Sequence, residues 1–147
     1  MGTRLRLIIA IIAICAVVVI GLIVTYFPAT EVTVDVSRDD FMEQGGAISE
    51  EVLANQWVDR LIITLCSNPT TGFEWELTEI TDEVVLMHSE NEYIPPDAEG
   101  VVGPDGKEVW TFKVLRPGES TISMAYSRPW EGGTEATWTF TLDVVTK

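Results

Sequence analysis

The sequence has few of the side chains on which enzymes and metal sites depend. It contains one histidine, His88, and two cysteines among 147 residues. Cys15 lies in an apolar run near the N-terminus and Cys66 in a strand-like stretch, so no disulfide within a domain is predicted. In such a strand Cys66 is expected to be a buried, inert thiol. Because no cluster of ligating residues has metal-site spacing, we expect no metal, no other cofactor and no enzyme activity.

Positive charge is also scarce. All 23 acidic residues follow Tyr26, together with seven of the nine basic ones, which leaves that part of the chain with a charge of −16. Nucleic acid requires a basic surface, so nucleic-acid binding is excluded as a function. The same charge disfavours lying on an anionic membrane, whereas it keeps the domain soluble and attracts a basic partner.

The first 27 residues have a different composition. From Leu7 to Val24 every residue is apolar or glycine, enough to span a bilayer as a helix. Arg4 and Arg6 precede this run, which predicts a transmembrane anchor (1–27) with the following domain (28–147) outside the cytoplasm. The alternative is a cleaved signal peptide, which would make the protein secreted. The run is long for a signal and Tyr26–Ala29 is a poor cleavage site, so the anchor is favoured and the question stays open.

The domain is predicted to be all-β. Apolar residues alternate with polar ones around Val32–Val36, Leu61–Leu65, Val109–Val114, Ile122–Tyr126 and Ala136–Val144, with weaker patterns at Phe73–Ile80 and Val84–Ile94. About seven strands separated by turn signals favour an immunoglobulin-like β-sandwich. Residues 40–56 break the pattern and are interpreted as an insertion, in which Ser49 could cap a short helix over Ser49–Leu53.

Three unusual connections are expected to meet at one end of this sandwich. If successive strands are antiparallel, alternate connections are neighbours: Asn68–Gly72, Pro95–Gly106 and Arg128–Gly133. The insertion and two short turns, Thr81–Glu83 and Arg116–Glu119, would lie at the opposite end. By the same reasoning the first strand begins beside the three loops, so an anchor would restrict their access to a large partner. Loops gathered on a rigid scaffold are typical of a binding face.

Two of these connections have the composition of preset binding loops. Pro69 fixes one φ, Gly72 permits a positive φ, and Asn68 can bond to its own backbone. An ordinary hairpin turn is the alternative interpretation. Trp130 lies between Pro129 and two glycines, which favours an interface anchor over a side chain folded back on the sandwich. The other four tryptophans are expected to pack in or beside strands: Trp57, Trp75, Trp110 and Trp138.

Three segments in this order resemble the signature loops of the chagasin family of cysteine-protease inhibitors. They are Asn68-Pro69-Thr70-Thr71-Gly72-Phe73, Gly103-Pro104-Asp105-Gly106 followed by Trp110-Thr111-Phe112, and Arg128-Pro129-Trp130. The likeness spans roughly Val58 to Val145. The middle loop departs from the family's Gly-x-Gly-Gly pattern, because Pro104 and Asp105 stiffen it and add a charge.

The resemblance implies a reversible inhibitor that occludes the cleft of papain-like cysteine proteases without chemistry, and we expect the domain to be monomeric. Thr70-Thr71-Gly72 would enter beside the catalytic cysteine, while the Gly103–Gly106 and Arg128–Trp130 loops would grip the cleft on either side. Trp130 would stack on an aromatic wall, and Arg128 would bond to the protease or brace its own loop. The alternative function is a membrane-tethered adhesion or sensor module that binds another protein through the same loops.

Overall fold

The computed structural model describes residues 30–55, 57–96, 105–128 and 136–147. From Glu31 onward these residues belong to one unit, Glu31–Lys147. The apolar run predicted as an anchor lies outside the described residues, and so does the predicted boundary between residues 27 and 28. Among the residues that are described, no helix combines the length and apolar character needed to cross a membrane.

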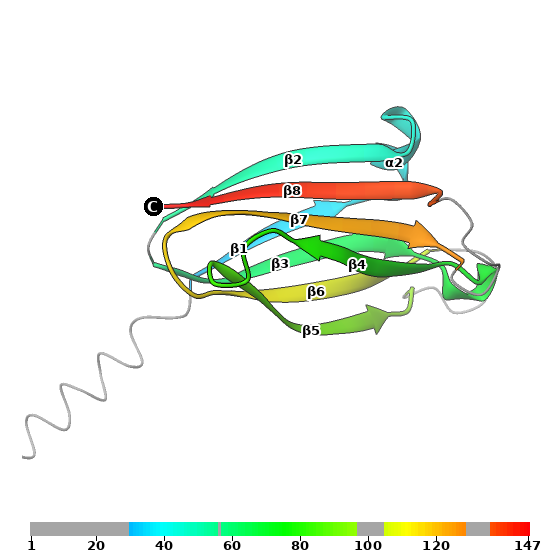
Figure 1. The fold of residues 1–147 in the computed structure, drawn as a ribbon. Coiled ribbons are helices and arrows are strands. Elements are labelled where there is room, and N and C mark those ends of the chain that lie inside the picture. Colours follow the sequence, from blue (N-terminus) through cyan, green and yellow to red (C-terminus); the bar gives the residue numbers. More distant parts are fainter. Residues whose placement is uncertain (1–29, 56, 97–104, 129–135) are drawn as a thin grey trace, which may run out of the picture. The chain divides into compact units, whose positions relative to one another are not determined.

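The described residues form two four-stranded sheets packed face to face (Figure 1). The first sheet has the order β1-β3-β6-β5, with bounds Thr30–Val36, Val58–Ser67, Gly106–Val114 and Leu86–Ile94. The second has the order β2-β8-β7-β4, with bounds Ala47–Ala54, Trp138–Thr146, Gly118–Ser127 and Glu74–Ile80. The prediction of an all-β sandwich is confirmed, with eight strands in the described part of the chain instead of seven.

The core lies between the sheets, where the alternating residues point. Ile122, Met124 and Tyr126 of β7 are buried, and so are Phe140 and Leu142 of β8. Their polar neighbours in sequence face solvent because successive strand side chains project to opposite faces. Burying each such large apolar side chain contributes about 1.5–3 kcal/mol, so the pattern that predicted the strands also accounts for their pairing.

The predicted helix over Ser49–Leu53 is wrong. These residues lie in β2, where Ile48 and Ala54 are buried and Val52 is partly buried, the alternation of a strand. The helix, α2 (Arg38–Glu43), comes earlier and begins at a capping box in which Ser37 and Asp40 satisfy each other's backbone N–H groups. Strand-like alternation on one buried face outweighs the helix-start signal at Ser49, because tertiary burial decides between weak local preferences.

The extra strand reverses two further predictions. β2 runs parallel to β8, with Ala47 opposite Thr139 and Ala54 opposite Thr146. Two ion pairs give the direction of β1: Glu31 at its start pairs with Arg60 near the start of β3, and Asp35 near its end pairs with Lys107 near the start of β6. β1 thus runs in the opposite sense to β2. Hence β1 begins at the end away from the three loops, and α2 lies at the end that carries them.

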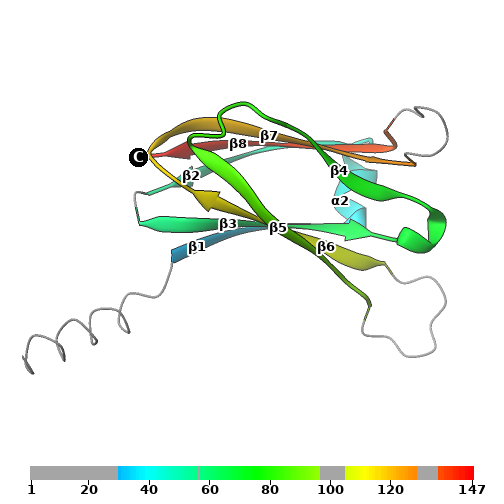
Figure 2. The same cartoon turned by 60° about the horizontal axis from the view of Figure 1, so that its bottom comes forward.

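The meeting of the three connections is confirmed at their described ends. Ser67 at the end of β3 pairs with Gly106 at the start of β6, so the connections after β3 and before β6 share one end. Glu74 at the start of β4 pairs with Ser127 at the end of β7, which brings in the third connection. Figure 2 shows this end opposite the C-terminus, and we call it the loop end and its opposite the far end.

The packing of α2 can be tested by two neighbouring substitutions. Phe41 has no exposed surface and contacts the rings of Trp75 and Trp138, whereas Met42 is 69% exposed. Phe41→Ala should lower the free energy of unfolding by about 3–5 kcal/mol, because it leaves a cavity in the core. Met42→Ala should change it by less than about 0.5 kcal/mol. Urea unfolding measures both, and equal effects would mean that α2 is not part of the core.

Candidate functional site

The segment Asn68–Phe73, which we call the wedge loop, has a fixed backbone. Pro69–Thr71 form one turn of 3-10 helix, and Gly72 ends it in the left-handed region with φ 85°. The N–H of Thr71 bonds to the Asn68 carbonyl at 3.1 Å, and that of Gly72 to the Pro69 carbonyl at 2.9 Å. The prediction that Gly72 takes a positive φ is confirmed, and only glycine adopts this conformation without strain.

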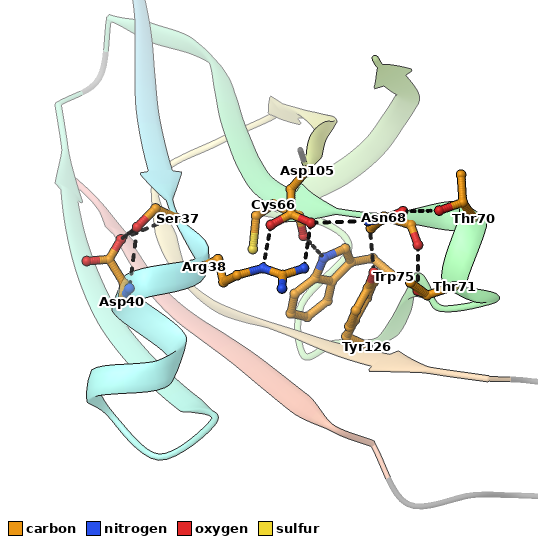
Figure 3. Close-up of polar contacts among 10 residues, drawn as sticks. All are labelled: Ser37, Arg38, Asp40, Cys66, Asn68, Thr70, Thr71, Trp75, Asp105 and Tyr126. Atoms are coloured by element: carbon orange, nitrogen blue, oxygen red, sulfur yellow. Dashed lines mark hydrogen bonds and ion pairs between the residues drawn. The ribbon is translucent and has the colours of Figure 1, made fainter. Parts of the chain in front are cut away.

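Side chains hold the same loop from within (Figure 3). The Thr70 hydroxyl donates to Oδ1 of Asn68 at 2.5 Å, and the Thr71 hydroxyl donates to the Asn68 carbonyl at 2.6 Å. The predicted bond from the Asn68 side chain to its own backbone is absent from the described contacts, because Oδ1 serves Thr70 instead. Both threonines are exposed, so the loop presents an ordered tip whose threonine hydroxyl groups are already bonded within the loop.

Both ends of the wedge loop are fixed to the sandwich. The Asn68 N–H donates to the Tyr126 hydroxyl of β7 at 2.9 Å, which joins the loop to the opposite sheet. The buried carboxylate of Glu108 accepts from the Ser67 hydroxyl at 2.6 Å and from the Trp75 N–H at 3.4 Å. Ser67 precedes the loop and Trp75 follows it, so one carboxylate bonds to both flanks.

An aromatic cluster supports the loop end. Phe73 stacks on Tyr126 with ring centroids 5.3 Å apart, and Tyr126 stacks on Trp138 at 5.2 Å. Trp138 in turn stacks on Phe41 of α2 at 5.0 Å. Such ring pairs add about 0.5–1.5 kcal/mol each beyond the area that they bury. The cluster makes a rigid base that spans the distance from α2 to the wedge loop.

Two arginines lie over the ends of this cluster. Cζ of Arg128 is 4.5 Å from the Phe73 ring centroid, and Cζ of Arg38 is 5.7 Å from that of Trp138. Both are cation–π distances. The two arginines, Thr71 and Tyr126 help to line a shallow recess of about 260 Å³ beside the wedge loop. Arg128 thus contacts the end of the wedge loop. The prediction that it braces its own loop stays a prediction, because residues 129–135 lie outside the described part of the chain.

The described end of the middle loop also reaches the wedge loop. Asp105 forms a two-point ion pair with Arg38 and accepts from Nδ2 of Asn68 at 3.4 Å. Gly106 begins β6 in close contact with β5, where an added Cβ would meet the Tyr93 hydroxyl and lie 2.5 Å from the Ile94 carbonyl oxygen. The charge introduced by Asp105 is therefore turned inward, and glycine is required at 106 for space.

Comparison with known proteins identifies the family. The model of the chagasin family of peptidase inhibitors, I42, matches residues 57–144, which is more than half of the chain. The chain belongs to the chagasin family. The predicted resemblance is confirmed, and it includes the wedge loop, Asp105, Gly106 and Arg128. Residues before 57, including α2 and β2, precede the matched region.

Individual relatives agree with this assignment to the chagasin family. Amoebiasin-2 of Entamoeba histolytica is 38% identical over 88 residues, which are 59% of this chain and 70% of the relative. Chagasin of Trypanosoma cruzi is 35% identical over 83 residues, 54% of this chain and 74% of the relative. The crystal structure of the cysteine protease inhibitor EhICP2 from Entamoeba histolytica has a TM-score of 0.59 at 26% identity, covering 82% of this chain and 100% of that one.

The other predicted site residues have mixed outcomes. Gly103, Pro104, Pro129 and Trp130 lie outside the described residues, so their roles remain predictions. Packing of the strand tryptophans is confirmed for Trp75 and Trp110, which are 4% and 6% exposed, and Trp138 is partly buried against the core. The prediction that Trp57 packs against the strands is wrong. It is 69% exposed in the turn between β2 and β3, where its N–H bonds to the Asn55 side chain.

Cys66 has the environment of an inert thiol. Its side chain is buried next to the wedge loop, and its carbonyl accepts from the Trp75 indole N–H at 2.9 Å. Burial, with a smaller contribution from the nearby Asp105 carboxylate, raises the pKa of the Cys66 thiol to about 11. Because the thiolate is the reactive form, this cysteine is not suited to nucleophilic chemistry near neutral pH. The predicted burial of Cys66 is confirmed, and the raised pKa supports its interpretation as an inert thiol.

Sequence reasoning missed three residues that fix the loop end: Arg38, Glu108 and Tyr126. Tyr126 and Glu108 were visible only as members of alternating strand patterns. A signal for the position of Arg38 did exist, because Ser37-x-x-Asp40 has the spacing of a capping box and places residue 38 in the first helical turn. No local pattern pairs Arg38 with Asp105, which lies 67 residues away in the sequence.

The carboxylate that bonds to both loop flanks should give stability an unusual pH dependence. Burial raises the pKa of Glu108 above its ordinary value of 4.5, although the Ser67 and Trp75 bonds partly oppose this shift. A carboxyl with a raised folded-state pKa stabilises the fold below its unfolded pKa, and that contribution is lost as pH rises through the folded value.

Glu108→Gln should therefore unfold at a higher temperature than the parent at pH 7, and the gap should close near pH 4. Glutamine is neutral, and its carbonyl oxygen keeps an acceptor for Ser67 and Trp75. Thermal unfolding followed by circular dichroism at both pH values provides the measurement. Glu76→Gln, at an exposed position of β4, is the control and should follow the parent. A gap that is constant with pH would contradict the assignment.

Proposed function

We propose that this protein is a reversible inhibitor of papain-like cysteine proteases that occludes the active-site cleft with the loop end. The observation that carries the proposal is the wedge loop, an exposed tip held by internal bonds in a chain that belongs to a peptidase-inhibitor family. The relative EhICP2 is a cysteine protease inhibitor, which indicates the class of protease.

The geometry of the wedge loop suits binding without cleavage. Its backbone and side-chain bonds fix one conformation before any partner arrives, so little conformational entropy remains to be lost on docking. Entry of Thr70, Thr71 and Gly72 into a cleft would exclude substrate and water while the inhibitor remains uncleaved. The loops that contain Gly103–Gly106 and Arg128–Trp130 would contact the walls of the cleft on either side, with Trp130 as an aromatic anchor.

We also propose that the N-terminal apolar run anchors the protein in a membrane, with the inhibitor domain on the extracytoplasmic side. The hydropathy and flanking arginines of the sequence support this orientation. Strand β1 begins at the far end of the sandwich, so the chain enters the domain away from the wedge loop. The expected restriction of access rested on β1 beginning beside the loops, so that expectation loses its basis.

Inhibition of papain by a soluble fragment, Glu31–Lys147, is the direct test of this function. We expect inhibition at or below micromolar concentration. Thr71→Ala should weaken inhibition about tenfold, because it removes contact surface and an internal hydrogen bond at the tip. The matched control is Thr78→Ala on β4, an exposed threonine whose hydroxyl also donates to a backbone carbonyl, that of Ser123.

Two results would contradict this function. Absence of inhibition at micromolar fragment, with a cooperative unfolding transition proving that it is folded, would favour an adhesion or sensor module. Equal losses for Thr71→Ala and Thr78→Ala would mean that the wedge loop is not the contact surface.

The anchored form should inhibit as strongly as the soluble fragment. The full-length chain in lipid vesicles and the fragment in solution are compared by their inhibition constants for soluble papain, with detergent-solubilised full-length chain as the control. Agreement within about threefold is expected because the loop end and the start of β1 lie at opposite ends of the sandwich. A much weaker vesicle-bound form would show that the membrane or the tether blocks the loops.

A further inference from the structure

A continuous line of polar contacts joins α2 to the wedge loop (Figure 3). Arg38 donates from Nη2 to Oδ1 of Asp105 at 2.5 Å, and its Nε pairs with the second carboxylate oxygen. The same Oδ1 accepts a hydrogen bond from Nδ2 of Asn68 at 3.4 Å, and Oδ1 of Asn68 accepts a hydrogen bond from the Thr70 hydroxyl. The line therefore begins outside the region that matches the family and ends at the tip of the loop.

The ion pair has the geometry of a specific contact. Two donors of the guanidinium meet the two oxygens of one carboxylate, an arrangement that fixes orientation as well as distance. The Asp105 side chain is 18% exposed, whereas that of Arg38 is 49% exposed. Without Arg38 a largely buried carboxylate would lose its counter-charge and turn toward water, which would take it away from Asn68.

Arg38 itself is held in place by packing. The capping box fixes the start of α2, with the Ser37 hydroxyl 2.6 Å from Oδ2 of Asp40. Phe41, one turn further on, is fully buried against Trp138, and the Arg38 guanidinium lies over the same tryptophan ring. Because the helix cap and the buried Phe41 fix the position of Arg38, the ion pair with Arg38 restricts where the Asp105 carboxylate can lie.

We propose that Arg38 is a positioning residue for inhibition: through Asp105 it holds Asn68 and thereby keeps the wedge loop in its binding conformation before the protease arrives. This proposal rests on the proposed function. It assigns a role to Asp105, which departs from the family's glycine pattern in the middle loop. It also makes α2 part of the inhibitory machinery, although α2 precedes the region that matches the family. Preorganisation of this kind is expected to affect the lifetime of the complex most.

The test uses the full-length chain in mild detergent and papain as the target. Arg38→Ala should raise the dissociation rate about tenfold, with a smaller rise for Arg38→Lys, which keeps the charge but loses the planar two-point contact. Arg60→Ala is the matched control, because it removes an arginine from an exposed ion pair with Glu31 at the far end. That control should dissociate like the parent.

Two further measurements separate positioning from direct contact with the protease. In an Asp105→Ala background, Arg38→Ala should have no further effect on dissociation, since Arg38 acts through Asp105. Hydrogen exchange without protease should be faster at the Thr71 and Gly72 amides of Arg38→Ala, while the thermal midpoint remains within a few degrees of the parent.

The proposal is overturned if Arg38→Ala dissociates and exchanges like the parent. It is also overturned if Arg38→Ala speeds dissociation equally in the Asp105→Ala background, or without any change in exchange, because both results indicate direct contact with the protease. Failure of the parent to inhibit papain would reject the proposed function alone, because the exchange measurement tests the Arg38–Asp105–Asn68 contacts without any protease.

Discussion

The loop end depends on one constraint, which is that the chain must cross from one sheet to the other at Asn68–Phe73. A crossing loop would ordinarily leave backbone groups unpaired at the edge of the core, and each buried unpaired group is costly. Here Tyr126 accepts the Asn68 N–H, and Glu108 accepts from both flanks of the loop. The backbone N–H groups of Asn68 and Trp75, one on each side of the crossing, are thereby hydrogen-bonded, and a short, ordered tip projects beyond them.

Packing and polar contacts share the work of fixing this tip. The aromatic cluster sets the position of the loop end as a whole, because close-packed rings tolerate little displacement. The contacts of Asp105 then relate the middle loop to the wedge loop, and Arg128 contacts the wedge loop from the third. Elements far apart in sequence thus meet around one hexapeptide, which is how a small domain without a disulfide among its described residues presents a rigid binding surface.

The sequence predicted the class of fold and most of the strands, since period-two alternation reflects which face of each strand is buried. It also predicted that three connections meet at one end. It failed on direction, because one unrecognised strand, β2, reverses the inferred direction of the strand before it. Interpreting residues 40–56 as an insertion without a strand placed both that insertion and the start of β1 at the wrong ends. It failed on Trp57 as well, where a position beside a strand was mistaken for a position in the core.

By itself the sequence determined the family, the preset backbone of Asn68–Phe73 and the need for glycine at 72, all of which depend on local chemistry. Only the tertiary structure decided that Asp105 turns inward, that Arg38 reaches it, and that the chain enters the sandwich away from the wedge loop. The physical reason is distance along the chain. Contacts between residues dozens of positions apart follow from strand order and register, and no local pattern encodes these.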